Sequence, residues 1–177
     1  MAASCQSGSL FFVLGGEGKF VEIDESAFVR RKHNVGRTVK TQWVFGGFEV
    51  GSTNIFMVAV ENRSAETLML ILKKYILPGT TIVSDFWRAY LRIGQHGYHH
   101  LTVNHKLNFV DPQTLATTNH IEATWNSAKR RNRSDCGTAR TQLDSYLIEF
   151  MWRFKFRNDP FGNLLEHIRE VLELPRY

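Results

Sequence analysis

The sequence has only two cysteines, four prolines and no long apolar run, and each scarcity excludes a class of protein. Cys5 and Cys136 stand far apart, so neither a disulfide framework nor a cysteine zinc site is expected. No apolar run reaches the roughly 18 residues of a membrane-spanning helix, and no signal-peptide core with a basic flank is present. We therefore expect an intracellular protein that is not secreted and has no membrane partner.

The 177 residues do contain enough apolar surface for one folded domain, together with a surplus of positive charge. Apolar residues make up 43% and charged residues 22%, which excludes a disordered chain, a collagen-like repeat and a coiled coil. Lys and Arg number 22 against 17 Asp and Glu, a formal net charge of +5. Such a surface favours a polyanionic partner, with nucleic acid as the first candidate.

Alternating and β-branched apolar runs predict a sheet with an antiparallel and a parallel part. Three strands come first, at residues 19–24, 41–50 and 54–60. Gly51 and Ser52 join the last two strands in hairpin fashion. Ser64 then caps a helical pattern, and residues 80–85 form a strand that ends in an acid. Because strand, helix and strand follow in that order, we expect a right-handed crossover to a parallel neighbour.

The remainder of the chain is predicted to be mostly helical. After a strand near residues 101–103, a polar loop leads to three helices that begin near Asn119, Gln142 and Pro160. Three antiparallel strands, then parallel strands, then flanking helices is the order of a mixed-sheet, RNase H-like α/β domain. We assign residues 19–177 to this domain, C-terminal helices included, and expect residues 1–18 to be a disordered leader.

Three acidic residues stand where this fold could bring them together. Asp24 is expected at the end of the first strand, Asp85 at the end of the crossover strand, and Glu122 in the first turn of the helix near Asn119. Mg²⁺ accepts one or two carboxylates, and two such ions about 3.5–4 Å apart can clamp the attacking and leaving oxygens of a phosphodiester. Converging carboxylates therefore predict metal-dependent cleavage of nucleic acid.

Each acid also has an interpretation without catalysis. Asp24 and Asp85 could be ordinary acids at strand ends. Asn119 with Glu122 three positions later forms a capping box, in which the glutamate only ties down the helix start. Because glutamine serves in a capping box but is a poor Mg²⁺ ligand, Glu122→Gln separates the two interpretations.

Basic runs flank the predicted acids. They comprise Arg30, Arg31 and Lys32 after the first acid and Lys129, Arg130, Arg131 and Arg133 after the third. Lys129 and Asn126 share one helical stripe with Glu122, and Asn119 and Asn126 are secondary site candidates. Such runs often form only a solvated face, but their position favours phosphate contact. They also fit a nuclear-import signal, which favours the nucleus if the source is eukaryotic and otherwise the cytoplasm.

Seven motifs follow one another along the chain. They are Val21-Glu-Ile-Asp-Glu25, Gln42-Trp-Val-Phe-Gly-Gly47, Val83-Ser-Asp-Phe-Trp87, Thr102-Val-Asn-His105, Asn108-Phe-Val-Asp-Pro112, Thr118-Asn-His-Ile-Glu-Ala-Thr-Trp125 and Glu149-Phe-Met-Trp-Arg153. In this order they resemble DDE transposases of the Merlin superfamily, eukaryotic relatives of bacterial insertion-sequence transposases. The resemblance spans about residues 17–157. It implies that Asp24, Asp85 and Glu122 are the catalytic, metal-binding triad and that Lys129 contacts DNA.

The resemblance also implies a reaction and its partners. Two Mg²⁺ or Mn²⁺ ions would support hydrolysis of DNA at transposon ends, after which the freed 3′-hydroxyl attacks target DNA. The chain would self-associate during transposition. Complete transposases of this kind carry a further N-terminal region for terminal repeats, so we expect a catalytic portion without end recognition. The alternatives are a remnant or domesticated protein that only binds DNA, and a nuclease of the same fold acting on RNA–DNA hybrids.

Overall fold

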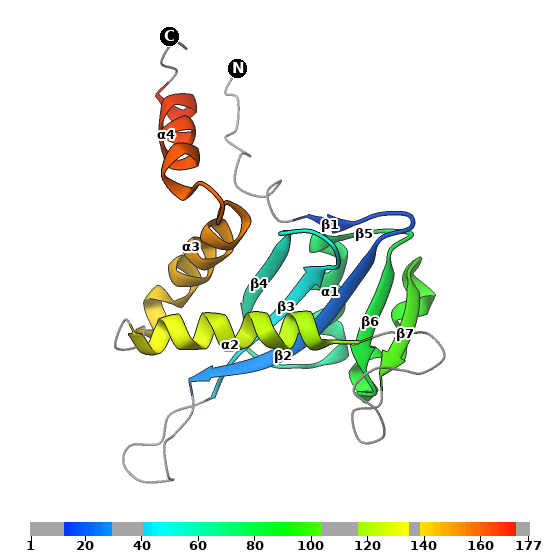
Figure 1. The fold of residues 1–177 in the computed structure, drawn as a ribbon. Coiled ribbons are helices and arrows are strands. Elements are labelled where there is room, and N and C mark those ends of the chain that lie inside the picture. Colours follow the sequence, from blue (N-terminus) through cyan, green and yellow to red (C-terminus); the bar gives the residue numbers. More distant parts are fainter. Residues whose placement is uncertain (1–12, 30–40, 104–116, 135–138, 173–177) are drawn as a thin grey trace, which may run out of the picture.

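A five-stranded mixed sheet forms the centre of the computed structural model, which describes residues 13–29, 41–103, 117–134 and 139–172 (Figure 1). Its strands are β2 (Phe20–Val29), β3 (Gln42–Glu49), β4 (Ile55–Val60), β6 (Thr81–Asp85) and β7 (His99–Val103). They lie in the order β4-β3-β2-β6-β7; β2, β3 and β4 are antiparallel, and β6 and β7 run parallel to β2. The predicted RNase H-like arrangement is confirmed.

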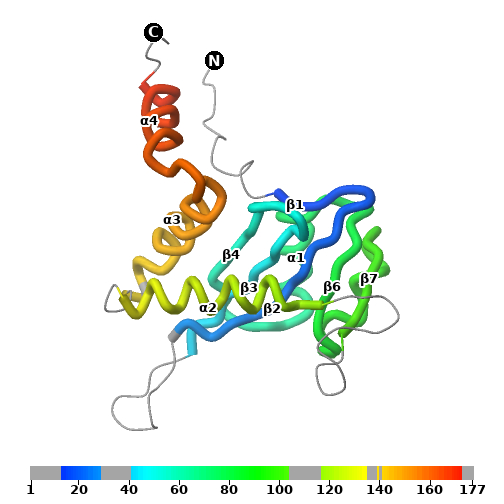
Figure 2. The backbone as a smooth tube through the Cα atoms, in the orientation of Figure 1, coloured from blue at the N-terminus to red at the C-terminus, as the bar shows by residue number. Residues whose placement is uncertain are grey.

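The described residues form four α-helices, of which α1 and α2 lie on opposite faces of this sheet. They are α1 (Ala65–Tyr75), α2 (Asn119–Ser134), α3 (Leu143–Lys155) and α4 (Pro160–Val171), with 3-10 turns η2 (Arg88–Tyr90), η3 (Ile93–His96) and η4 (Arg140–Gln142). In Figure 1, α2 lies in front of the sheet and α1 behind it. The tube in Figure 2 shows α3 and then α4 leading away from the sheet toward the C-terminus. Within the described ranges, no helix combines the length and apolarity needed to cross a membrane.

Local sequence explains where the helices begin. Ser64 caps α1 by accepting a hydrogen bond of 3.3 Å from the backbone N–H of Thr67. Asp159 caps α4 in the same way through the N–H of Gly162 at 2.9 Å, and Pro160 occupies the first turn. These two predicted helix starts are confirmed.

The core lies on both sides of the sheet and depends on strand alternation. Val21 and Ile23 of β2 are fully buried on the α1 side, where Phe56 of β4 stacks on Tyr75 with ring centroids 5.1 Å apart. On the other side, Ile121, Trp125 and Ala128 form one stripe of α2 that packs into the core. Even-numbered residues of β2 therefore face α2.

Two sequence predictions are wrong in position. The disordered leader predicted at residues 1–18 ends too late, because β1 (Leu14–Gly15) pairs in parallel with β5 (Ile76–Leu77) and Leu14 is fully buried. Residues 1–12 lie outside the described residues. Asp24 is not at a strand end, because β2 continues to Val29 as the partner of β3.

Candidate active site

Asp24 and Asp85 lie on neighbouring parallel strands at the sheet face that α2 covers. β2 and β6 pair in register as far as Glu22 opposite Val83. Continuing that register by two residues brings Asp24 level with Asp85, and strand alternation points both side chains to the same face. The charge of Asp85 acts on the Asp24 carboxyl and helps to raise its pKa. The structure therefore brings these two predicted site residues together.

An indole joins α2 to the first of these aspartates. Trp125 donates a hydrogen bond of 3.1 Å from Nε1 to Oδ2 of Asp24. It can approach so closely because Gly46 lies opposite Asp24 on β3, and a Cβ at Gly46 would stand 2.7 Å from the Trp125 ring. Phe28 of β2 packs edge-on against the same indole, with ring centroids 5.9 Å apart. Trp125 therefore belongs to the core and also orients Asp24.

A buried carboxylate from β2 closes the N-terminus of α2. Glu22 is fully buried and accepts hydrogen bonds from the backbone N–H of Ile121 at 2.9 Å and from Nδ1 of His120 at 2.6 Å. Helix N-termini have unpaired N–H groups and a partial positive charge, so a carboxylate is stabilising there. The His120 ring in turn stacks on Phe48, with centroids 5.2 Å apart. Glu22 therefore sets where α2 begins relative to the sheet.

Glu122 is placed between these two attachments of α2. It precedes Trp125 by three residues, about one helical turn, and its side chain is exposed. Thr118 donates a hydrogen bond of 3.2 Å from Oγ1 to Oε1 of Glu122. The charge of Glu122 contributes to the raised pKa of Asp24, so the third predicted acid also lies near the first.

The capping box predicted for Asn119 and Glu122 is wrong. Asn119 is the first residue of α2, and its own N–H donates to Oγ1 of Thr117 at 3.1 Å. The carboxylate that receives a helix N–H is Glu22, through Ile121. Glu122 instead accepts its hydrogen bond from Oγ1 of Thr118, the residue that precedes the helix.

Burial and like charge raise the pKa values of two adjacent carboxyls on β2. Desolvation is the largest cause for Asp24; the charges of Asp85 and Glu122 add to it, while hydrogen bonds from Trp125 and from a backbone N–H oppose it, and the pKa reaches about 6. Desolvation also raises the pKa of Glu25 to about 8, assisted by the charges of both aspartates. A cation bound beside Asp24, Asp85 and Glu122 would favour the ionised forms of these carboxyls. The three acids are therefore electrostatically suited to bind a cation.

Glu25 lies on the opposite face of β2 from Asp24, because neighbouring strand residues alternate. Within the described residues its Oε1 is buried without a hydrogen-bond partner, and its Oε2 lies 3.8 Å from Arg63. The Arg63 guanidinium stands 3.7 Å above the Trp43 ring and 5.0 Å from the Trp87 ring. This packing braces the back of the sheet behind the two aspartates.

The donor set suits a hard divalent cation, although a closed metal site is not formed. Asp24, Asp85 and Glu122 supply only carboxylate oxygens, the ligand type preferred by Mg²⁺ and Mn²⁺. Across the part of the chain that the structure describes, no three His, Cys, Asp or Glu side chains already surround one point as metal ligands. The acids are gathered in one region, but coordination would require them to move closer together.

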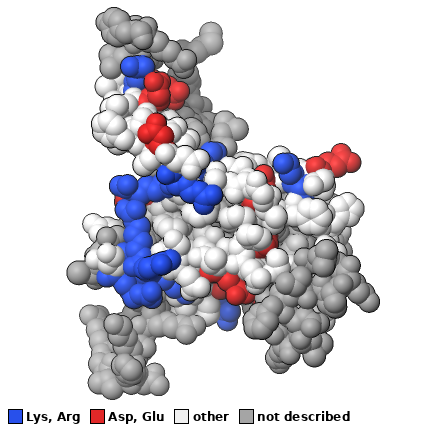
Figure 3. Space-filling view, in the orientation of Figure 1, with Lys and Arg blue, Asp and Glu red and all other residues white. Residues whose placement is uncertain are grey.

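The other predicted site residues are spread along α2. Asn119, Asn126, Arg130 and Arg133 are exposed, Lys129 and Arg131 are half-buried, and Arg30, Arg31 and Lys32 lie outside the described residues. The Lys129 ammonium stands 5.9 Å from the Phe28 ring centroid, and Arg131 forms an ion pair of 2.8 Å with Glu149 of α3. In Figure 3, Lys and Arg side chains gather over the C-terminal half of α2 and extend toward α3.

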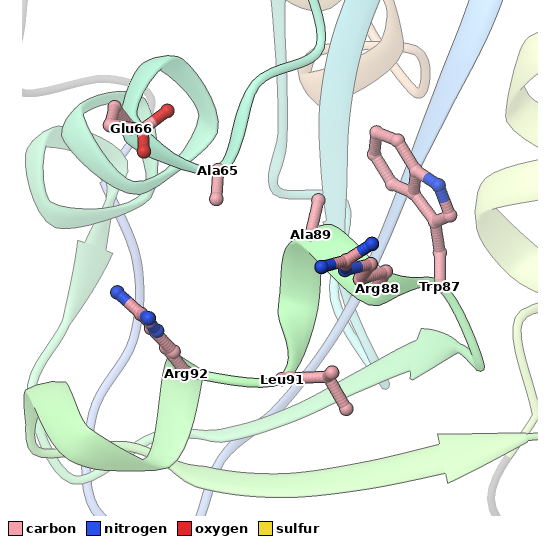
Figure 4. A pocket seen from close by; sticks show the side chains of 7 residues that line it. All are labelled: Ala65, Glu66, Trp87, Arg88, Ala89, Leu91 and Arg92. Carbon is pink, nitrogen blue, oxygen red and sulfur yellow. The ribbon is translucent and has the colours of Figure 1, made fainter.

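A separate cavity of about 540 Å³ opens between the start of α1 and η2 (Figure 4). It is lined by Ala65, Glu66, Trp87, Arg88, Ala89, Leu91 and Arg92. None of the three clustered acids contributes to it. The carboxylate region is therefore distinct from this cavity.

Sequence reasoning missed several residues that position the acids. Glu22, Gly46, His120 and Trp125 all lie inside quoted motifs, yet none was assigned a task at the site. One signal was available for Glu22: an acid two residues before Asp24 on a strand must share its face and so must meet whatever covers Asp24. Gly46 gave no comparable signal, because its role depends on a distant tryptophan.

Most of the sequence matches the model of a known protein family. Residues 14–155 match the ISXO2-like transposase domain. An uncharacterised transposase-like protein of Haemophilus influenzae is 28% identical over 100 residues, which are 56% of this chain and 80% of that protein.

Solved structures share the fold at low sequence identity. The catalytic core domain of BIV integrase aligns with a TM-score of 0.50 and 14% identity, covering 86% of this chain and 97% of that one. A chain of the simian T-cell lymphotropic virus intasome aligns with a TM-score of 0.49 and 11% identity over 80% of this chain, which spans about half (50%) of that chain's length. The integrase core shows the fold alone.

Proposed function

Because the chain belongs to the ISXO2-like transposase domain family, we propose that it cleaves DNA at transposon ends and joins the freed ends to target DNA. The observation that carries this proposal is the grouping of Asp24, Asp85 and Glu122 around one sheet face. Two strands and one helix contribute one acid each, and α2 is attached to β2 on both sides of Glu122. We assign the catalytic and metal-binding roles to these three residues.

The acids would hold two Mg²⁺ or Mn²⁺ ions. When bound, these ions would activate the attacking oxygen and stabilise the leaving oxygen of a phosphodiester. The protein's own part is positional: Trp125 holds one oxygen of Asp24, and Glu22 fixes the start of the helix that carries Glu122. The exposed side chain of Glu122 would be drawn toward the two aspartates when the ions bind.

The α2 cations would hold the DNA backbone. Lys129 and Arg133 lie seven and eleven residues after Glu122, close to the same side of the helix, and Asn126 lies between Glu122 and Lys129. We assign phosphate contact to Lys129, Arg130, Arg131 and Arg133, with Asn119 and Asn126 as secondary contacts. Arg30, Arg31 and Lys32 remain part of the proposed DNA surface on sequence grounds.

A plasmid-nicking assay tests the proposal. The full chain is incubated with supercoiled DNA and Mg²⁺ or Mn²⁺, and nicked product is compared with that of Asp85→Asn and Glu122→Gln. Both variants are expected to fold as wild type and to lose metal-dependent nicking by at least about a hundredfold. Nicking retained by Glu122→Gln would remove that residue from the proposed triad.

One observation favours a second function, that of a protein that binds DNA without cutting it. The described carboxylates do not already form a three-ligand metal site. A wild-type chain that binds DNA but never nicks it with either metal would support this alternative. An RNA–DNA hybrid offered in the same assay would detect a nuclease of different substrate preference.

The finer assignments are proposals as well. The seven quoted motifs favour the Merlin superfamily, whose members are relatives of insertion-sequence transposases, and we propose self-association during strand transfer. Nuclear residence in a eukaryotic source, or cytoplasmic residence otherwise, follows from the proposed DNA substrate.

A further inference from the structure

We propose that duplex DNA bound at the carboxylates continues across the C-terminal end of α3, where Arg153 and Arg157 contact its phosphates. The inference rests on the proposed function, because it takes DNA as the substrate. It adds a second surface, on an element that none of the predicted DNA contacts occupies, and it gives the DNA a direction away from the site.

A series of three ring contacts links Arg157 to the start of α2. The Arg157 guanidinium stands 5.2 Å from the Phe154 ring centroid. Phe154 meets Phe48 edge-on at 6.2 Å, and Phe48 stacks on His120 at 5.2 Å. His120 is two residues from Glu122. The end of α3 is therefore linked, through Phe48 of β3, to the part of α2 that carries the proposed catalytic glutamate.

An ion-pair bridge joins α3 to the C-terminal half of α2. Glu149 of α3 accepts a hydrogen bond of 2.8 Å from Arg131 of α2 and another of 2.8 Å from Arg153 of α3. Two arginines thus share one carboxylate, which leaves one positive charge uncompensated by this bridge. Tyr146 of α3 also holds the two helices together, because its hydroxyl donates a hydrogen bond of 2.6 Å to the backbone carbonyl of Ala128 of α2. The two helices therefore present their cations in a fixed relation.

The space-filling view shows the result. We name the basic band: Lys129, Arg130, Arg131 and Arg133 of α2 with Arg153, Lys155 and Arg157 of α3 and the turn after it. In Figure 3, Lys and Arg side chains form a nearly continuous track from the left half of α2 upward over α3. Acidic side chains lie to the right of this track, over the other half of α2.

The chemistry of the basic band fits the sugar-phosphate backbone of a duplex. Its cations come from arginine and lysine side chains of two helices, and arginine binds phosphate oxygens through two parallel N–H groups. A track of cations that extends beyond the catalytic acids can hold DNA on one side of the cleavage point without reading its sequence. The ligand is therefore duplex DNA of any sequence.

The test measures how DNA affinity depends on salt. Fluorescence anisotropy follows a labelled random-sequence duplex binding to the full chain, without divalent metal, at several NaCl concentrations. Arg153→Gln with Arg157→Gln is compared with Lys73→Gln plus Lys74→Gln, which removes two exposed charges from α1 behind the sheet. Losing two phosphate contacts should make the slope of log affinity against log salt shallower by about 1.8. The α1 pair should leave the slope near wild type.

A charge-preserving variant guards against loss of folding. Arg153→Lys with Arg157→Lys should recover most of the slope, and thermal melting should show that all variants remain folded. Equal slopes for the band pair and the α1 pair would overturn the inference, whether both fall or neither does. Because nicking with metal is measured separately, a chain that nicks DNA and has no such difference loses this inference alone. A wild-type chain that binds no DNA loses the proposed function as well.

Discussion

Replacing Gly46 by alanine tests how α2 is held against the sheet. The added Cβ would lie 2.7 Å from Cη2 and 2.9 Å from Cζ2 of the Trp125 ring, and 2.9 Å from the backbone oxygen of Phe56. The backbone oxygen of Phe56 is fixed in the sheet and cannot turn away from the added Cβ. The indole of Trp125 is a side chain, so it is the group that must withdraw. Withdrawal would lengthen the 3.1 Å hydrogen bond between Trp125 and Asp24.

Two opposing terms set the size of the effect. Overpacking a filled core costs about 1–3 kcal/mol. Because Gly46 does not need a left-handed backbone, alanine also restricts the unfolded chain, which stabilises the fold by about 0.4–1 kcal/mol. We therefore expect Gly46→Ala to lower the free energy of unfolding by about 1–2 kcal/mol. Metal-dependent nicking should fall with it, because Asp24 loses its orienting donor.

Urea unfolding provides the measurement and Gly94→Ala the control. A Cβ at Gly94 meets nothing within 4 Å, so that variant should be neutral or slightly stabilising. In a Trp125→Phe background the Gly46→Ala cost should shrink, because the smaller ring lacks the atoms in conflict. The reasoning fails if Gly46→Ala matches Gly94→Ala, or if its cost is the same in both backgrounds.

Three further predictions concern the acids. Glu22→Ala should lower the free energy of unfolding by about 1–3 kcal/mol, because the buried N–H of Ile121 loses its acceptor, and Glu22→Gln should cost less; equal losses in urea would contradict the capping role. The folded-state pKa values of Asp24 (about 6) and Glu25 (about 8) lie above their unfolded values of 3.8 and 4.5, so the folded state binds extra protons between each pair of values. Stability should therefore decrease as pH rises from about 4 to about 8. Asp24→Asn should therefore melt higher than wild type above about pH 6 and show a flatter pH profile; an unchanged profile would count against the burial of charge. Mg²⁺ should raise the melting temperature of wild type and not that of Asp24→Asn, whereas equal shifts would place the ion elsewhere.

Much of the site could be anticipated from local patterns. The positions of the strands along the chain follow from runs of alternating and β-branched apolar residues. The crossover rule is then enough to put the strand of Asp85 beside that of Asp24. Once β6 is parallel to β2 and the two aspartates are level with each other, strand alternation places both side chains on the same face of the sheet. The buried stripe of α2 likewise follows from its helical period and leaves Glu122 outside it.

The parts that sequence analysis missed depend on contacts between distant residues. Capping rules search within the first turn of a helix, but the acceptor for α2 is Glu22, which lies 99 positions before Ile121 in the chain. The two-residue strands β1 and β5 are too short to show a period, so residues Leu14 and Gly15 were assigned to a leader. Gly46 is a strand residue whose need for small size arises only from the indole above it.

The two attachments of α2 to β2 have matching lengths. Glu22 and Asp24 are two strand residues apart, about 6.6–6.8 Å. Their partners Ile121 and Trp125 are four helical residues apart, a rise of about 6.0 Å. An insertion or deletion of one residue inside either stretch would turn a bonded side chain toward the wrong side and leave its partner unmatched. The chain can therefore change length between its motifs far more readily than within these two short segments. The matched spacing of the two segments sets the position of α2, and with it Glu122, relative to the aspartates.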